Sequence, residues 1–235
     1  MAQRQTTSDV QSEKVIVAAI VLAGGVGTRF GGPKYAATLH GRRLVDRAID
    51  LVRPLCRDVV VVLPPGHTWD GDDVSGVATG GVSRTESLRT ALPLLRPDVE
   101  VVVTHDCVRP LASTSQLVAA IDAVLAGADA AIPGWEPPDP VKRVLPDGSI
   151  EHVGREGLVI VQSPSAYRRS TLDRVFAELE EIPIDESMGV ELIGGRVESV
   201  VGDRWSHHLV DERDLAMFGK LAGATPADLT DLGGH

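Results

Sequence analysis

The chain has 235 residues, of which 43% are hydrophobic but only 3% aromatic, and its formal net charge at pH 7 is −10. This length fits one α/β domain with a well-covered sheet, and the shortage of aromatic residues predicts an aliphatic core. The negative charge argues against general attraction to nucleic acid or to anionic membranes, so an anionic substrate would need cations gathered locally.

The ends of the chain differ in character from the segment between them. Residues 1–13 are polar and unpatterned and predict a disordered leader, and residues 223–235 look like a flexible tail, which leaves a single domain over residues 14–222. The leader has no apolar signal-peptide core, and the two cysteines form no closely spaced pair. We therefore expect a cytoplasmic protein that is not exported and does not bind membranes.

The first predicted strand, residues 15–22, is apolar and largely β-branched without polar alternation, which indicates a strand covered on both faces. Three glycines follow it, Gly24, Gly25 and Gly27. Such a turn can bring backbone N–H groups against an anion, and Arg29 and Lys34 add two cations nearby. The stretch predicts a cradle for a nucleoside triphosphate. An ordinary strand-to-helix turn is the alternative, but it gives no reason for the two cations.

Strands and helices alternate along the rest of the chain. Apolar residues at helical spacing predict helices over residues 43–56, 84–95, 117–125, 172–179, 188–193 and 212–221. Short apolar runs predict strands over residues 59–63, 74–79, 99–104, 128–133, 158–161 and 197–201. A capping box, Ser113-Thr114-Ser115-Gln116, precedes the third helix. The alternation predicts an α/β fold with a mostly parallel, twisted sheet and helices on both faces.

Residues 136–154 break this alternation. The segment is rich in proline and charge and includes a turn signal, Pro146-Asp147-Gly148, between two short extended pieces. It predicts a β-hairpin arm that projects from the domain.

Two polar motifs follow strands, at the places where ligands collect in an open α/β sheet. Residues 80–87, GGVSRTES, offer backbone amides, hydroxyls and Arg84 to a base or a phosphate; the alternative is that Ser83 caps a helix and Arg84 is solvated. Asp106, in HDCVRP at residues 105–110, is placed as an Mg²⁺ ligand that Arg109 could orient; the alternative is a salt-bridged or capping Asp.

These two motifs and the glycine-rich LAGGVGTRFGGPK resemble, in order and spacing, the IspD/TarI-type cytidylyltransferases. That family joins CTP to a polyol phosphate such as 2-C-methyl-D-erythritol 4-phosphate or ribitol 5-phosphate, and the resemblance spans roughly residues 15–221. It implies a Rossmann-like nucleotidyltransferase fold, a homodimer that exchanges arms, and dependence on Mg²⁺.

The resemblance also implies roles for individual residues. The catalytic residues it implies are Arg29, Lys34 and Asp106, with Asp106 as the metal-linked acid. The nucleotide contacts it implies are Ala23, Gly24, Gly25, Gly27, Gly81, Arg84, Ser87 and Asp106. The contacts to the phosphorylated acceptor it implies are Arg109, Asp139, Lys142, Arg155, Ser163, Asp185 and His208.

The acceptor side departs from the family pattern at three positions. Pro140 and Ser163 stand where threonines are usual, and His208 stands where a phosphate-binding lysine is usual. We therefore expect CMP transfer from CTP to a phosphorylated polyol, a sugar phosphate or a phosphonate other than methylerythritol phosphate. Methylerythritol phosphate cytidylyl transfer in isoprenoid synthesis is the first alternative.

The expected reaction is in-line attack of an acceptor phosphate oxygen on the α-phosphorus of CTP, with pyrophosphate leaving and no covalent nucleophile. Three different functions stay open as well. The compact RFGGPK loop also resembles molybdenum-cofactor-type nucleotidyltransferases, and the chain could be a catalytically silent nucleotide-binding paralogue. A glycosyltransferase of related fold would need an Asp-x-Asp metal motif. The segment Asp70-Gly71-Asp72 matches this pattern, but it follows a Pro/Gly turn, which predicts a solvated loop instead of a metal site.

Overall fold

The computed structural model describes residues 15–25, 30, 32–182 and 185–222. The main sheet consists of β1 (Val17–Leu22), β4 (Asp58–Leu63), β5 (Gly76–Thr79), β6 (Val101–Asp106), β7 (Ala130–Trp135), β10 (Ile160–Val161), β11 (Ser165–Arg168) and β12 (Val197–Val201). The strand order is β10-β7-β11-β6-β1-β4-β5, and β12 also pairs with β7. The helices are α1 (Leu44–Val52), α2 (Arg84–Ala91), α3 (Thr114–Leu125), α4 (Arg169–Glu178), α5 (Glu186–Leu192) and α6 (Glu212–Ala222). Shorter elements are the 3₁₀ turns η1 (Lys34–Ala36) and η2 (Leu92–Leu94) and the strands β2 (Thr38–Leu39), β3 (Arg42–Arg43), β8 (Val141–Val144) and β9 (Ile150–Val153).

The predicted, mostly parallel α/β sheet is confirmed, with one strand that the sequence pattern does not reveal. β1 is parallel to β4 and β6, and β4 to β5 and β12 to β7 are parallel pairs as well. β11, however, inserts antiparallel between β6 and β7. Its four residues contain no apolar run, so periodicity gives no signal for it. Pairing with two long neighbours makes it a strand.

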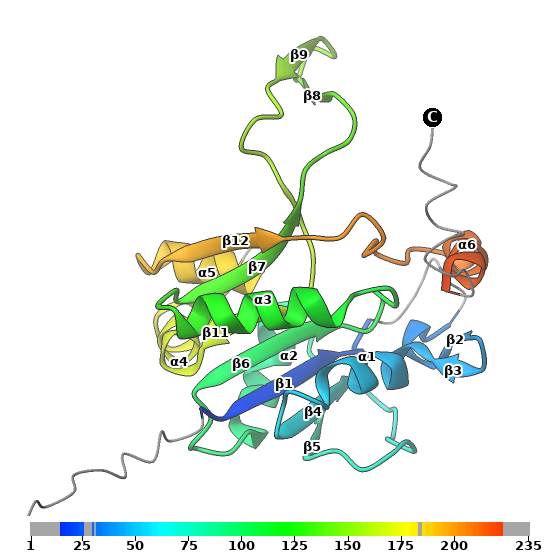
Figure 1. Cartoon of the computed structure of the whole chain (residues 1–235), viewed down its shortest axis with the longest axis vertical. Helices are drawn as coiled ribbons and strands as arrows, with labels where there is room; N and C mark the ends of the chain where they lie inside the picture. Colours follow the sequence, from blue (N-terminus) through cyan, green and yellow to red (C-terminus); the bar gives the residue numbers. More distant parts are fainter. Residues whose placement is uncertain (1–14, 26–29, 31, 183–184, 223–235) are drawn as a thin grey trace, which may run out of the picture.

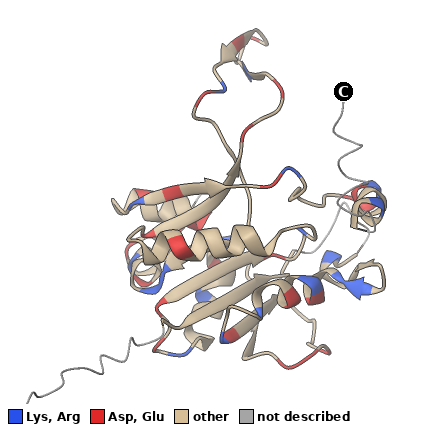
Figure 2. Cartoon of the chain, in the orientation of Figure 1, with Lys and Arg blue, Asp and Glu red and all other residues tan. Residues whose placement is uncertain are grey.

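Helices cover both faces of the sheet (Figure 1). The continuous apolar run of β1 explains this, because its side chains alternate between two cores. Val17, Ala19 and Val21 pack with α1 and α3, whereas Ala18 and Ile20 pack with residues from α2, α4 and α5. Figure 2 shows the charged residues on helices, loops and the arm, while the strands of the sheet are mainly uncharged. A strand buried on both faces positions the residues that directly follow it, 23–25.

Side chains at three helix starts satisfy backbone N–H groups. The predicted capping box of α3 is confirmed, because Ser113 and Gln116 bond each other's backbone reciprocally. Ser83 Oγ accepts from Glu86 N at the start of α2, and Asp185 Oδ1 accepts from Met188 N at the start of α5. Each such cap contributes about 1 kcal/mol to stability.

Strands β8 and β9 form an antiparallel hairpin at the end of the excursion that leaves the sheet after β7 (Figure 1). Its side chains are largely exposed, including two apolar ones, Val144 at 70% and Ile150 at 64%. The hairpin therefore buries little apolar surface against its own chain.

The last described helix, α6, packs on β2, away from the arm (Figure 1). Phe218 of α6 joins Leu39, Leu44 and Leu209 in a small third core. This core anchors the segment before α6, which carries His208, next to the end of β1. No helix among the described residues is both long and apolar enough to span a membrane.

Candidate active site

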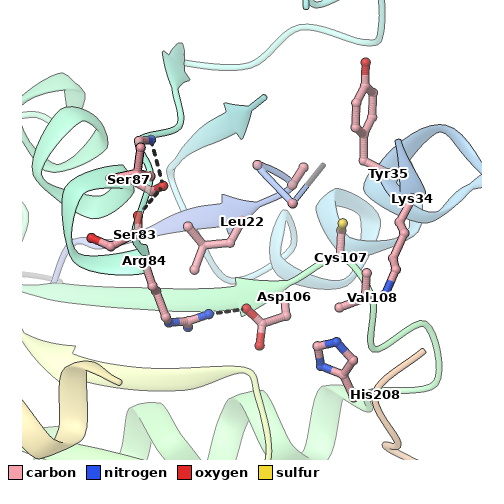
Figure 3. Close-up of a pocket in the computed structure, with 15 residues that line it drawn as sticks. Leu22, Lys34, Tyr35, Ser83, Arg84, Ser87, Asp106, Cys107, Val108 and His208 are labelled. Carbon is pink, nitrogen blue, oxygen red and sulfur yellow. Dashed lines mark hydrogen bonds and ion pairs between the residues drawn. The ribbon is translucent and has the colours of Figure 1, made fainter. Parts of the chain in front are cut away.

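A cavity of about 370 Å³ lies where β1 and β6 end, next to each other in parallel register with Leu22 opposite Asp106. Because β1 is flanked by strands that come later in the chain on both sides, this edge is the topological switch point at which open α/β sheets bind ligands. The volume of the cavity falls in the range of small-molecule binding sites. The lining residues are Leu22, Ala23, Gly24, Gly25, Lys34, Tyr35, Gly81, Val82, Ser83, Arg84, Ser87, Asp106, Cys107, Val108 and His208 (Figure 3).

The predicted nucleotide loops form one wall of this cavity. Ala23 N donates to Val62 O at 2.9 Å, which ties the turn after β1 to β4. A Cβ on Gly81 would lie 2.3–2.5 Å from the Glu86 side chain, so only glycine fits there without a shift. Gly24 and Gly25 line the cavity as well. Two predicted residues, Gly27 and Arg29, lie outside the described residues.

The Ser87 hydroxyl holds the loop over residues 80–83 in place through two hydrogen bonds. Its Oγ accepts from Gly81 N at 3.0 Å and donates to Ser83 O at 2.9 Å. The hydroxyl thus links the start of the loop to the start of α2. This arrangement positions the loop's backbone for a ligand.

Arg84 lies between two carboxylates at the back of the cavity. Its Nη1 donates to Asp106 Oδ1 at 2.5 Å, and its Nε donates to Glu186 Oε1 at 2.6 Å. Figure 3 shows the Arg84–Asp106 pair facing the cavity. The alternative of a solvated Arg84 is therefore wrong. Sequence reasoning missed Glu186; it selected the adjacent Asp185, which caps α5 and does not line the cavity.

Asp106 is charged at all physiological pH values. Burial alone would raise the pKa of this carboxyl, but the charge and hydrogen bond of Arg84 lower it to about 2. Asp106 Oδ2 lies 3.9 Å from Arg109 Nε and receives no second bond from Arg84. No group of three or more His, Cys, Asp or Glu side chains in the described part of the chain is arranged as a metal site. One carboxylate beside a phosphate cradle still fits Mg²⁺, which takes few protein ligands and completes its shell with phosphate oxygens and water.

Lys34 begins η1 on the opposite wall, and its Nζ donates to Leu209 O at 3.0 Å. His208 lies between Lys34 and Asp106 in Figure 3. Desolvation lowers the pKa of His208, so its imidazole is neutral at pH 7. Burial likewise raises the pKa of the Cys107 thiol, which excludes a thiolate nucleophile there at neutral pH.

Ser163 lies beneath the cavity instead of lining it. Its Oγ accepts from Asp106 N at 3.1 Å and lies 3.1 Å from Nδ1 of the buried His105. The hydroxyl therefore holds the backbone of Asp106 in place. Arg109 is similarly engaged, with its guanidinium donating to Ser206 O and Val161 O.

The other predicted acceptor residues lie on the arm. Asp139, Lys142 and Arg155 are exposed, and Arg155 Nη1 donates to the carbonyls of Pro137 and Pro138. None of them lines the cavity of its own chain. The structure thus gathers Lys34, Arg84, Asp106 and His208 and leaves the arm residues apart from them.

The buried His105 gives the protein a measurable acid sensitivity. Desolvation lowers its pKa from 6.5 to about 4, so the unfolded chain binds a proton between these pH values and the native chain does not. Stability from this residue is complete above pH 6.5 and is lost as the pH falls toward 4, by on the order of 3 kcal/mol. Urea denaturation at pH 7 and pH 4.5, without metal, should show a smaller loss in His105→Asn than in the unchanged protein. Equal losses in the two proteins would contradict this assignment.

Comparisons with known proteins show the family to which this chain belongs. The family model described as IspD, 2-C-methyl-D-erythritol 4-phosphate cytidylyltransferase, matches residues 17–221. A protein of that name from Frankia casuarinae is 37% identical over 90% of this chain and 84% of its own length. A bifunctional IspD/IspF enzyme from Clavibacter michiganensis is 33% identical over 86% of this chain, which spans 53% of that protein.

Solved structures show the same fold. The crystal structure of 2-C-methyl-D-erythritol 4-phosphate cytidylyltransferase from Thermus thermophilus superposes with a TM-score of 0.78 at 24% identity, covering 89% of this chain and 100% of that one. The family match over residues 17–221 sets aside the molybdenum-cofactor, glycosyltransferase and silent-paralogue alternatives. The chain belongs to the IspD family of cytidylyltransferases and is a nucleotidyltransferase enzyme.

Proposed function

We propose that the protein transfers CMP from CTP to 2-C-methyl-D-erythritol 4-phosphate and releases pyrophosphate. The observation that carries the proposal is the placement of Lys34 and the Arg84–Asp106 pair on opposite walls of one glycine-lined cavity, in a chain that matches the family over residues 17–221. The Frankia relative, at 37% identity, carries the name of this acceptor.

The cavity walls suit the two ends of a nucleoside triphosphate. The loop over residues 80–83, which the Ser87 hydroxyl holds in place, lines the part of the cavity proposed for the base, and the exposed Val82 offers an apolar contact there. The turn after β1 and Lys34 offer N–H groups and a cation to the phosphates. Because the reaction moves negative charge onto pyrophosphate, these fixed donors stabilise the transition state more than the ground state.

Asp106 would hold Mg²⁺ together with phosphate oxygens of the nucleotide. When bound, this ion neutralises charge on the phosphates and favours departure of pyrophosphate. Asp106 is ready for this role, because its pKa of about 2 leaves it ionised and the Ser163 hydroxyl fixes its backbone.

The acceptor phosphate acts as the nucleophile, so the protein must align it with the α-phosphorus instead of forming a covalent intermediate. The neutral Cys107 thiol in the cavity is consistent with this. His208 faces the same space and, as a neutral imidazole, can donate one hydrogen bond to a phosphate oxygen.

The structure weakens the reasons for expecting another acceptor. Of the three departures from the family pattern, only His208 faces the cavity of its own chain. Ser163 uses its hydroxyl on Asp106 and His105, so its missing methyl changes no surface of the cavity. Pro140 lies on the exposed arm. The argument for a different phosphorylated polyol as the acceptor therefore depends on His208. It also depends on Pro140 if the arm of a second copy of the chain reaches the cavity.

Steady-state kinetics tests the proposal and its alternative together. Pyrophosphate release should be measured with CTP, GTP and ATP against methylerythritol phosphate, ribitol 5-phosphate and a panel of sugar phosphates. We expect CTP and methylerythritol phosphate to give the highest kcat/KM, above about 10⁴ M⁻¹s⁻¹. A clear preference for another acceptor would favour the alternative, and a preference for GTP or ATP would contradict the proposal.

A homodimer is part of the same proposal. The arm exposes Val144 and Ile150 and carries Lys142 and Arg155 away from the cavity of its own chain. In a two-fold dimer the arm of one copy would cover apolar surface on the other and bring these cations toward its cavity. We also propose a cytoplasmic location. The two buried thiols of Cys56 and Cys107, which form no disulfide, support it.

Charged substitutions on the arm should separate the dimer. We expect the Val144→Glu/Ile150→Glu variant to sediment as a monomer at micromolar concentration and to lose activity with the acceptor, because the apolar contact and the positioned cations are lost together. Glu178→Lys, an exposed change on α4, should remain a dimer. A monomeric unchanged protein, or a double variant that stays dimeric, would count against the model.

A further inference from the structure

Glu186 is a buried charge that the mechanism above does not use. It is the first residue of α5, only 2% exposed, and it does not line the cavity. A carboxylate is almost never buried this completely unless it is paired and hydrogen-bonded, because desolvation is costly. Its partner is Arg84, which belongs to the proposed site.

The contacts of Glu186 leave neither of its oxygens unused. Arg84 donates to it twice, from Nε to Oε1 at 2.6 Å and from Nη2 to Oε2 at 3.2 Å. The Oε2 atom also receives weaker bonds from Thr104 Oγ1 at 3.5 Å and from Tyr167 OH at 3.4 Å. Strand β6, strand β11 and helix α5 thus fix this carboxylate, and the carboxylate fixes one edge of the guanidinium.

This two-point contact determines which N–H groups of Arg84 remain for Asp106. Because Nε and Nη2 are taken by Glu186, only Nη1 reaches Asp106, and it bonds Oδ1 alone. An arginine without that restraint can turn and bind both oxygens of a carboxylate, the preferred geometry of such pairs. Arg84 is shared between two carboxylates, and Arg109 Nε lies 3.9 Å from Asp106 Oδ2, so neither arginine forms a hydrogen bond to that oxygen.

Resting on the proposed function, we propose that Glu186 is a positioning residue for the transfer reaction. It holds Arg84 side-on, so that Arg84 orients Asp106 through one oxygen and does not cover the other. Among the described residues the proposed catalytic groups are Lys34 and Asp106, and Glu186 acts on Asp106 only through Arg84.

A double-mutant cycle separates this role from a merely structural one. Glu186→Gln keeps the shape of the side chain but removes its charge, and we expect kcat/KM to fall by at least about tenfold. Arg84→Met removes the guanidinium. If Glu186 acts through Arg84, the Arg84→Met/Glu186→Gln variant should be no less active than Arg84→Met alone. Losses that multiply in the double variant would overturn the proposal.

Two matched controls report on general effects. Glu191→Gln makes the same chemical change on the exposed surface of α5 and should keep full activity. Thr171→Val removes a hydrogen bond of a buried hydroxyl to Asp129 elsewhere in the same layer, so it lowers the thermal midpoint without touching Arg84. If the two variants have the same thermal midpoint and Glu186→Gln loses no more kcat/KM than Thr171→Val, the proposal would be overturned.

A substrate-free measurement keeps this test apart from that of the proposed function. The Nε–H resonance of Arg84, assigned by its absence in Arg84→Met, should exchange slowly in the unchanged protein and shift or broaden in Glu186→Gln. An unchanged resonance in Glu186→Gln would overturn the positioning role. If the unchanged protein transfers CMP to no acceptor, the proposed function fails, while the resonance still reports whether Glu186 restrains Arg84.

Discussion

Replacing Lys34 with alanine is expected to lower kcat/KM by at least about 10²-fold, on the order of 3 kcal/mol of lost transition-state stabilisation, with the fold intact. Lys34 begins η1 beside the glycine turn, so its charge faces the space where the phosphates would lie. The chain has a net charge of −10, so an anionic triphosphate needs cations placed locally at this site. Initial rates over a grid of CTP and acceptor concentrations measure the effect.

Two further lysine variants show whether the charge causes this loss. Lys34→Met keeps the apolar stem while removing the charge and the bond to Leu209 O, and it should be about as inactive as Lys34→Ala. Lys220→Ala removes an exposed lysine on α6 and should be fully active. Thermal midpoints of all three should stay near that of the unchanged protein. Near-normal turnover by Lys34→Met would remove Lys34 from the mechanism.

Asp106→Asn is expected to lower kcat/KM by at least about 10²-fold and to raise the Mg²⁺ concentration needed for half-maximal activity. The amide oxygen can still accept from Arg84, so the change removes charge more than shape. The pKa of Asp106 is about 2, so the carboxylate is fully ionised at pH 6 and above. The ratio of activities between the unchanged protein and this variant should therefore be constant from about pH 6 to pH 9.

A Mg²⁺ titration of both proteins at saturating CTP provides the measurement. Asp122→Asn, an exposed aspartate on α3, is the control and should titrate like the unchanged protein. If Asp106→Asn titrates normally, Asp106 serves only its ion pair with Arg84. If the activity ratio instead falls steeply near neutral pH, another titrating group would control the reaction.

Local sequence determined much of this fold. An uninterrupted apolar and largely β-branched run is typical of a strand covered on both faces, and β1 has that position. The capping box and the apolar spacing of α3 involve residues that are close together in the sequence, so they can be predicted without tertiary information. The same holds for the candidate site, because Asp106 ends β6 and Lys34 follows β1, and a parallel sheet brings the ends of these two strands to one edge.

Tertiary structure decided the features that depend on pairing between distant segments. β11 is a strand because β6 and β7 offer unpaired backbone groups on either side of it, not because of its own four residues. The residues of the arm themselves predict that it projects, but only the structure shows that Lys142 and Arg155 do not line the cavity of their own chain. Glu186 and Arg84 are 102 residues apart, and although the sequence motif singles out Arg84, nothing in the sequence points to Glu186 as its partner. Only burial makes their pairing necessary, because a charge removed from water must find its partner in space, whatever their separation along the chain.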